Sequence, residues 1–212
     1  MDCWFSTVAC SRDRPQSRDP LQSRERKGAG FLTTLLIAVL TGCTSSSPLP
    51  SLGLIPDFTL TDQANQEFRS ADALKRKVWI ADFIFTHCPG PCPRMTSQLR
   101  KIQDAIEAEP DIRLISFTVD PARDTPPVLA AYAEQFKARP GQWFFLTGSQ
   151  DALNQLARHA FKLGDVDGNL EHSTRFALVD KFGRLRGYYS ATSSEVIPQL
   201  IADAKALLKE KF

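Results

Sequence analysis

The chain has 212 residues, of which 42% are hydrophobic and 24% are charged, a composition that predicts one globular domain with an appendage and excludes bulk disorder. The formal net charge is +2, and the residues after Gly42 carry equal numbers of basic and acidic side chains. A neutral domain does not attract phosphate backbones, so we expect no nucleic-acid partner.

Residues 1–42 have the pattern of a lipoprotein-type signal peptide. Residues 24–27 include three basic side chains, and the apolar run 31–40 that follows is shorter than the roughly 20 residues needed to cross a bilayer. Leu40-Thr41-Gly42-Cys43 then resembles the lipobox of bacterial lipoproteins, in which a lipidated cysteine becomes the mature N-terminus. We therefore expect Cys43 to anchor the protein at the periplasmic or extracytoplasmic face of a membrane in a bacterial cell envelope. The alternative is a signal in which Cys43 is incidental, and basic residues from Arg12 onward leave the true translation start open.

Residues 43–54 are expected to form a flexible tether. Thr44 to Pro50 is rich in serine and proline and has no hydrophobic periodicity, which suits a spacer between a membrane-held end and a folded body. The folded domain is therefore predicted to span 55–212, beginning near Ile55.

A β-α-β unit is predicted in the first half of this domain. Val78 to Phe85 and Ile112 to Val119 are short runs rich in β-branched and aromatic residues, which is typical of buried strands. Between them, apolar residues recur at helical spacing from Pro93 to Ala108, and Pro93 is expected to occupy the first helical position.

The second half is predicted to alternate further helices and strands, judged from caps, turn residues and periodicity. These elements are a helix opening at Thr125 and Pro126 and ending near Lys137, a strand at Trp143–Leu146, a helix from Ser149 to about Phe161, an antiparallel hairpin of Arg175–Val179 and Leu185–Tyr189, and a helix opened by a capping box at Thr192–Glu195 and ending near Lys209. The order of elements predicts an α/β fold, a thioredoxin-like single domain with a central mixed sheet flanked by helices.

Of five cysteines, only Cys88 and Cys92 belong to the expected folded domain and remain available as ligands. Cys3 and Cys10 lie in the segment expected to be removed. An oxidising compartment tends to join a cysteine pair as a disulfide. A metal-binding role therefore requires a reductant that keeps both sulfurs available as thiolates.

Cys88 and Cys92 flank a Pro-Gly-Pro spacer between the first predicted strand and its helix. The positive partial charge of a helix N-terminus stabilises thiolates, so we expect both cysteines to be reactive or metal-binding. Soft sulfur ligands select copper(I), zinc or iron–sulfur clusters, and two sulfurs with one imidazole leave the four-ligand shell of structural zinc incomplete. A three-coordinate copper(I) site fits this inventory best, and a purely stabilising disulfide is the alternative.

The remaining candidates are three histidines and two aspartates. His172 ends a polar stretch just before a predicted strand, and the residues by themselves leave open whether it is a ligand or a structural histidine. His159 lies within an amphipathic helix and is expected to be structural, at the helix surface or the edge of the core. His87 is expected to be exposed or to lie beside the ligands. Turn chemistry accounts for Asp120 and Asp124, with partner docking as a further option.

Three segments of the chain together resemble the Sco/SenC family, thioredoxin-fold copper proteins that help assemble the binuclear copper centre of cytochrome c oxidase. The resemblance covers roughly Ile55 to Lys209. The segments that carry it are Thr86-His87-Cys88-Pro89-Gly90-Pro91-Cys92-Pro93, Val119-Asp120-Pro121-Ala122-Arg123-Asp124-Thr125-Pro126, and His172-Ser173-Thr174 before Phe176-Ala177-Leu178-Val179-Asp180.

The resemblance implies that Cys88, Cys92 and His172 bind copper, as Cu(I), Cu(II) or both. It also implies cytochrome c oxidase subunit II as the partner that receives the metal. Ile84, the Gly90-Pro91 spacer and Glu171 depart from the residues more usual in the family. These departures remove no ligand, but outer-shell groups tune copper affinity, redox potential and partner choice.

We therefore expect a membrane-anchored copper metallochaperone, served by a thiol reductant or an upstream copper donor. The alternative is a thiol-disulfide oxidoreductase or redox sensor acting on the cysteines of subunit II, with Cys88 as the attacking thiolate and Cys92 as the resolving thiol. Arg175 to Val179 contains no proline where thioredoxin-like reductases usually carry a cis-proline, which argues against general reductase activity. A peroxidase that uses Cys88 is a third, weaker interpretation, because the Thr86 spacing is unusual for such sites.

Overall fold

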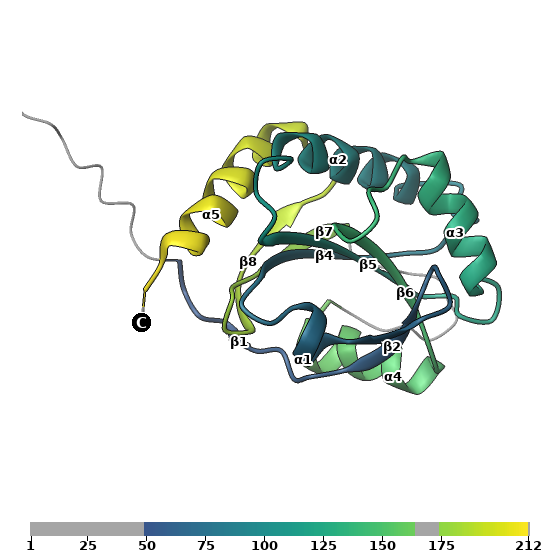
Figure 1. Cartoon of the computed structure of the whole chain (residues 1–212). Coiled ribbons are helices and arrows are strands. Elements are labelled where there is room, and N and C mark those ends of the chain that lie inside the picture. Colours follow the sequence, from purple (N-terminus) through teal and green to yellow (C-terminus); the bar gives the residue numbers. More distant parts are fainter. Residues whose placement is uncertain (1–48, 164–173, 212) are drawn as a thin grey trace, which may run out of the picture. The chain divides into compact units, whose positions relative to one another are not determined.

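The computed structural model describes residues 49–163 and 174–211. Within them the chain forms an eight-stranded mixed sheet in the order β1-β8-β7-β4-β5-β6-β2-β3 (Figure 1). The strands are β1 (Gly53–Leu54), β2 (Thr59–Asp62), β3 (Glu67–Arg69), β4 (Val78–Ile84), β5 (Ile112–Thr118), β6 (Trp143–Thr147), β7 (Arg175–Val179) and β8 (Arg184–Ser190). The helical segments are α1 (Ser70–Ala73), α2 (Cys92–Ala105), α3 (Pro126–Gln135), α4 (Gln150–Asn154) with a π-helical continuation η1 (Gln155–Ala160), a 3₁₀ turn η2 (Ser194–Val196) and α5 (Ile197–Lys209).

Helices cover both faces of the sheet. Figure 1 shows α2, α3 and α5 along one face and α1 and α4 on the other. The sheet is mixed because β4, β5 and β6 run parallel while the other neighbouring pairs are antiparallel. This arrangement confirms the predicted α/β, thioredoxin-like class with a central mixed sheet flanked by helices.

The predicted β-α-β unit is confirmed as β4, α2 and β5. All seven residues of β4 are buried, as expected for a central strand covered on both faces. Helix α2 begins one residue earlier than predicted, at Cys92, with Pro91 as its N-cap and Pro93 in its first turn. Both prolines are tolerated there because the first N–H groups of a helix have no partner within it.

The N-terminal part of the fold was not predicted from the sequence. Strands β1, β2 and β3 and helix α1 are each only two to four residues long. Strand β1 lies inside the segment assigned to the tether and pairs with β8. The buried Arg186 guanidinium also donates hydrogen bonds to the backbone carbonyls of Leu49 and Pro50. The folded part of the chain therefore extends further toward the N-terminus than the expected boundary at Ile55.

Most expectations for the second half are confirmed, and one cap is wrong. Strands β7 and β8 form the predicted antiparallel hairpin, and the Ser149 hydroxyl accepts a hydrogen bond from the Ala152 N–H at 3.2 Å. The capping box at Thr192–Glu195 does not form. Instead, residues 194–196 make a 3₁₀ turn before α5, and neither N-cap residue there accepts a side-chain capping bond.

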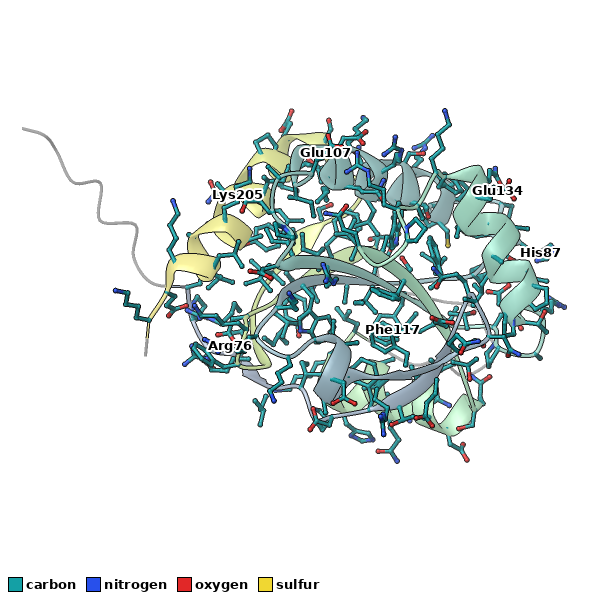
Figure 2. The ribbon with its side chains drawn as sticks, in the orientation of Figure 1. Arg76, His87, Glu107, Phe117, Glu134 and Lys205 are labelled. Carbon is teal, nitrogen blue, oxygen red and sulfur yellow. The ribbon has the colours of Figure 1, made fainter. Side chains whose placement is uncertain are left out.

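Aromatic packing builds the core on the α1 and α4 side of the sheet. Phe117 of β5 lies there (Figure 2), 5.0 Å between ring centroids from Phe83 of β4. Phe161, which follows η1, packs edge-on against Phe83 at 5.4 Å. All three rings are almost fully buried, and burial of a phenylalanine contributes roughly 1.5–3 kcal/mol. This core packs against β4, and β4 leads directly into residues 86–92, the cysteine segment.

Candidate metal centre

Strand β4 and helix α2 bring the two cysteines together. The chain leaves β4 at Ile84, turns through the segment 86–91 and enters α2 at Cys92. Cys88 is 8% exposed and Cys92 is fully buried, and the two are not joined by a disulfide. The Cys88 side chain is hydrogen-bonded to Cys92. Two reduced sulfurs in contact beneath the surface therefore lie where the sequence predicted a metal-binding pair.

Burial raises the pKa of the Cys92 thiol above its usual range, because apolar surroundings disfavour the charged thiolate. Its hydrogen bond with Cys88 and the negative charge of Asp82 raise this pKa further, whereas the Phe85 backbone opposes the shift. The expectation that the helix N-terminus would stabilise a thiolate is therefore wrong for Cys92. A helix terminus contributes only about 0.3–1 kcal/mol, which desolvation outweighs here. Copper or a disulfide partner must displace a proton from this sulfur.

Asp82 is a buried carboxylate on the same side of the sheet as α2 and α3. Its charge acts on Cys92 of α2 and on Tyr132 of α3, which fixes the face of β4 that it occupies. Neither carboxylate oxygen has a hydrogen-bond partner of acceptable geometry among the described residues. Desolvation raises the Asp82 pKa to about 7, partly offset by the nearby Ser116 hydroxyl. Asp82 therefore adds an ionisable group under the cysteines.

Thr96 of α2 and Tyr132 of α3 join the two helices beside Cys92. The Thr96 hydroxyl donates to the Cys92 carbonyl at 2.9 Å and lies 3.0 Å from the Tyr132 hydroxyl. Burial raises the pKa of Tyr132, so its phenol keeps its proton at neutral pH. This contact holds the first turn of α2 in place next to the buried sulfur.

Asp124 belongs to residues 119–126, the second of the family-like segments, and it is hydrogen-bonded to the cysteine segment through Thr86. Its side chain is fully buried and accepts hydrogen bonds from the hydroxyls of Thr86 and Thr118, both at 2.6 Å, and from the Thr86 N–H at 3.1 Å. Turn chemistry describes Asp120, whose carbonyl accepts from the Arg123 and Asp124 N–H groups. It does not account for Asp124, which instead fixes the chain two residues before Cys88.

The structure places two of the three histidines. His87 is exposed, which is one of its two expected places, and its Nδ1 lies 2.9 Å from the Thr86 hydroxyl. His159 is exposed on η1, which confirms its expected place at a helix surface. His172 lies outside the described residues, so its role as third ligand stays a prediction. Within 49–163 and 174–211, no three His, Cys, Asp or Glu side chains are grouped to hold a metal ion.

The sequence did not predict that Asp82 lies beneath the cysteines or that Asp124 binds the segment before Cys88 through Thr86. A signal for Asp82 was present, because it is the only charged residue in the apolar run of Val78 to Phe85. A charge in a buried strand is rare unless it is paired or functional. No comparable signal links Asp124 to Thr86, because the two are 38 residues apart and meet only through the parallel pairing of β4 and β5.

Comparison with known proteins identifies the family. The model of the SCO1/SenC family matches residues 49–209. The chain belongs to the SCO1/SenC family. A SCO1 protein homolog from Bacillus subtilis is 32% identical over 184 residues, which cover 84% of this chain and 95% of that protein. The residues matched by the family model, 49–209, include both cysteines, Asp82, Asp124 and the β7–β8 hairpin.

Solved Sco structures share the fold. A SCO1/SenC family lipoprotein from Bacillus anthracis has a TM-score of 0.69 and 32% identity, over 76% of this chain and 99% of that one. BsSco, described as a member of the Sco family of cytochrome c oxidase assembly proteins with a disulfide switch, has a TM-score of 0.67 and 31% identity, covering 78% and 100%. Yeast Sco1, solved with copper bound, has a TM-score of 0.60 and 26% identity, covering 77% and 96%.

Proposed function

We propose that this Sco-family chain is a copper metallochaperone that holds one copper ion through Cys88, Cys92 and His172 and passes it to cytochrome c oxidase. The observation that carries the proposal is the contact between two reduced, buried cysteine sulfurs at the start of α2. Two soft sulfurs and one imidazole suit Cu(I), and a low coordination number leaves room for an incoming ligand. Copper is the cargo of this site, and transfer proceeds by ligand exchange without a change in its oxidation state.

Copper retention tests the ligand set. The full chain, purified under reducing conditions with copper supplied, is expected to keep one copper ion per molecule, whereas Cys88→Ala, Cys92→Ala and His172→Ala proteins lose stoichiometric binding. His159→Ala is the matched control, because this histidine is exposed on η1. Unchanged copper content in the His172→Ala protein would remove His172 from the site and count against the proposal.

The proposed acceptor is subunit II of the oxidase, with a thiol reductant or an upstream copper donor serving the cysteine pair. Support comes from the description of BsSco as a member of a family of cytochrome c oxidase assembly proteins. Mixing the copper-loaded chain with the copper-free soluble domain of subunit II and measuring the copper in each after separation tests this step. Copper that stays wholly on the chaperone would contradict it.

A second function is favoured by the same pair of sulfurs, because adjacent reduced thiols can also exchange with a disulfide. In this reaction Cys88 attacks a disulfide of subunit II and releases one thiolate. Cys92 then loses its proton and attacks Cys88, which releases the second thiolate and leaves a Cys88–Cys92 disulfide. Two electrons pass from the chain to the substrate, and an external thiol reductant restores the pair. Turnover of a disulfide substrate by copper-free His172→Ala protein supports this function, and no turnover excludes it.

We also propose attachment to the outer face of a bacterial membrane through lipidated Cys43. The supporting features are the lipobox-like residues 40–43 and the similarity to a SCO1/SenC family lipoprotein. Among the residues that the structure describes, no helix is long and apolar enough to span a membrane. Mass spectrometry of the mature protein tests the proposal: a diacylglyceryl group on Cys43 is expected, and release of Cys43→Ala protein from washed membranes should accompany its loss.

A further inference from the structure

His87 is the exposed imidazole that immediately precedes Cys88. Figure 2 shows its side chain at the outer surface of the molecule, near α3. Cys92 is fully buried and Cys88 is nearly so. A copper ion that arrives from solvent therefore cannot bind both sulfurs as its first protein ligands. The exposed imidazole of the residue that precedes Cys88 is therefore available to a metal before the buried pair is.

A chain of hydrogen bonds leads from His87 into the protein. The Thr86 hydroxyl lies 2.9 Å from His87 Nδ1 and 2.6 Å from Asp124 Oδ1. Asp124 also accepts hydrogen bonds from the Thr86 N–H and the Thr118 hydroxyl, so it acts as the acceptor in each of these contacts, as expected of a carboxylate. These contacts give the His87 ring a defined partner although the ring itself is exposed.

The direction of these hydrogen bonds determines which nitrogen of the neutral His87 ring carries the proton. A hydroxyl has a single proton, and the short contact with a carboxylate uses that proton. The Thr86 oxygen can then only accept from His87, so the neutral ring must carry its proton on Nδ1. Its Nε2 atom keeps a lone pair and has no proton to lose. A neutral imidazole with one free nitrogen is a good copper ligand.

We propose that His87 Nε2 is the entry ligand through which copper reaches or leaves the Cys88–Cys92 pair, and that Thr86 and Asp124 are positioning residues that present this nitrogen. The inference rests on the proposed copper function and adds a transient site to it. A copper ion that arrives from solvent first binds the lone pair of Nε2 while it still holds one ligand from the molecule that delivered it. It then exchanges these ligands for the two sulfurs, and Cys92 gives up its thiol proton to solvent as its sulfur binds. No electron is transferred, and no proton is released from His87.

The rate of copper transfer tests the entry ligand. The full chain is mixed with Cu(I)–bathocuproine disulfonate, and the loss of that coloured complex is followed by stopped flow. His87→Gln is expected to slow transfer about tenfold, the lower end of the effect seen for groups that support metal ligands, and to leave the final copper content unchanged. His159→Gln, the other exposed histidine in the described part of the chain, should transfer at the wild-type rate. Equal rates for His87→Gln and wild type would overturn the proposal.

A spectroscopic readout tests the positioning residues without copper. The ¹⁵N NMR shifts of His87 in the metal-free chain at pH 8 are expected to show a proton on Nδ1. Thr86→Ser should keep this pattern because it keeps the hydroxyl, whereas Thr86→Val should lose it and slow copper transfer as His87→Gln does. A ring protonated on Nε2 in the wild type would overturn the proposal. If the wild type binds no copper, the metallochaperone function fails, and the NMR result still reports separately on the arrangement of His87.

Discussion

Replacement of the buried Asp82 by asparagine should change how the stability of the metal-free protein depends on pH. In the folded chain, desolvation raises the pKa of this carboxyl from 3.8 to about 7. A buried carboxyl whose pKa is raised by folding is neutral at low pH, where it places no charge in the core and does not lower the stability. Its contribution to stability is fully present below about pH 4 and is lost as the pH rises through 7. Asparagine is neutral throughout, so it removes this loss.

The magnitude follows from the shift. About three pH units at roughly 1.4 kcal/mol each give a wild-type loss of about 4 kcal/mol between pH 4 and pH 8, relative to Asp82→Asn. The asparagine amide has its own unmet hydrogen bonds, but their cost does not vary with pH. The raised pKa values of Cys92 and Tyr132 act only above the ordinary values of 9.0 and 10.0, outside this window.

Urea unfolding of reduced, copper-free protein at one-unit steps from pH 4 to pH 8 measures the effect. The difference in unfolding free energy between Asp82→Asn and wild type should rise steadily in favour of the variant. Asp57→Asn, which changes an exposed aspartate, is the control and should show no such trend. A constant difference for Asp82→Asn across this range would refute the argument that Asp82 is buried without a charge-stabilising partner.

Three further predictions concern the site and its support. Asp124→Ala leaves the hydroxyls of Thr86 and Thr118 without their acceptor and should lower the unfolding free energy by about 2–4 kcal/mol in urea titrations. A loss below about 1 kcal/mol would contradict a stabilising role for these two hydrogen bonds. In a Cys88→Ser protein, the rate of Cys92 alkylation by iodoacetamide should still be rising above pH 9, because burial raises its pKa, and a plateau below pH 8 would show that the thiolate is stabilised instead. Phe117→Ala should cost about 3–5 kcal/mol in the same unfolding assay, while a cost under 1 kcal/mol would contradict the packing of this ring against its aromatic neighbours.

The elements that the sequence predicted correctly are those with a strong local signal. Buried runs such as Val78–Ile84 show a strand directly, and the periodic apolar residues of α2 show a helix. The two-cysteine motif between them is also local, so its position at the strand–helix junction followed without knowledge of the rest of the fold. The short strands β1, β2 and β3 have no such signal, because two to four residues become strands only by pairing with distant partners.

The properties of the site were decided by tertiary structure. The helix N-terminus predicted a stabilised thiolate at Cys92, but the depth of burial, which the sequence does not reveal, reversed the sign of the pKa shift. Asp124 looked like a turn residue until the pairing of β4 with β5 brought it to Thr86, 38 positions away. Local patterns thus identify which residues can perform chemistry, whereas desolvation and long-range hydrogen bonds, which depend on the whole packed chain, determine their protonation and orientation.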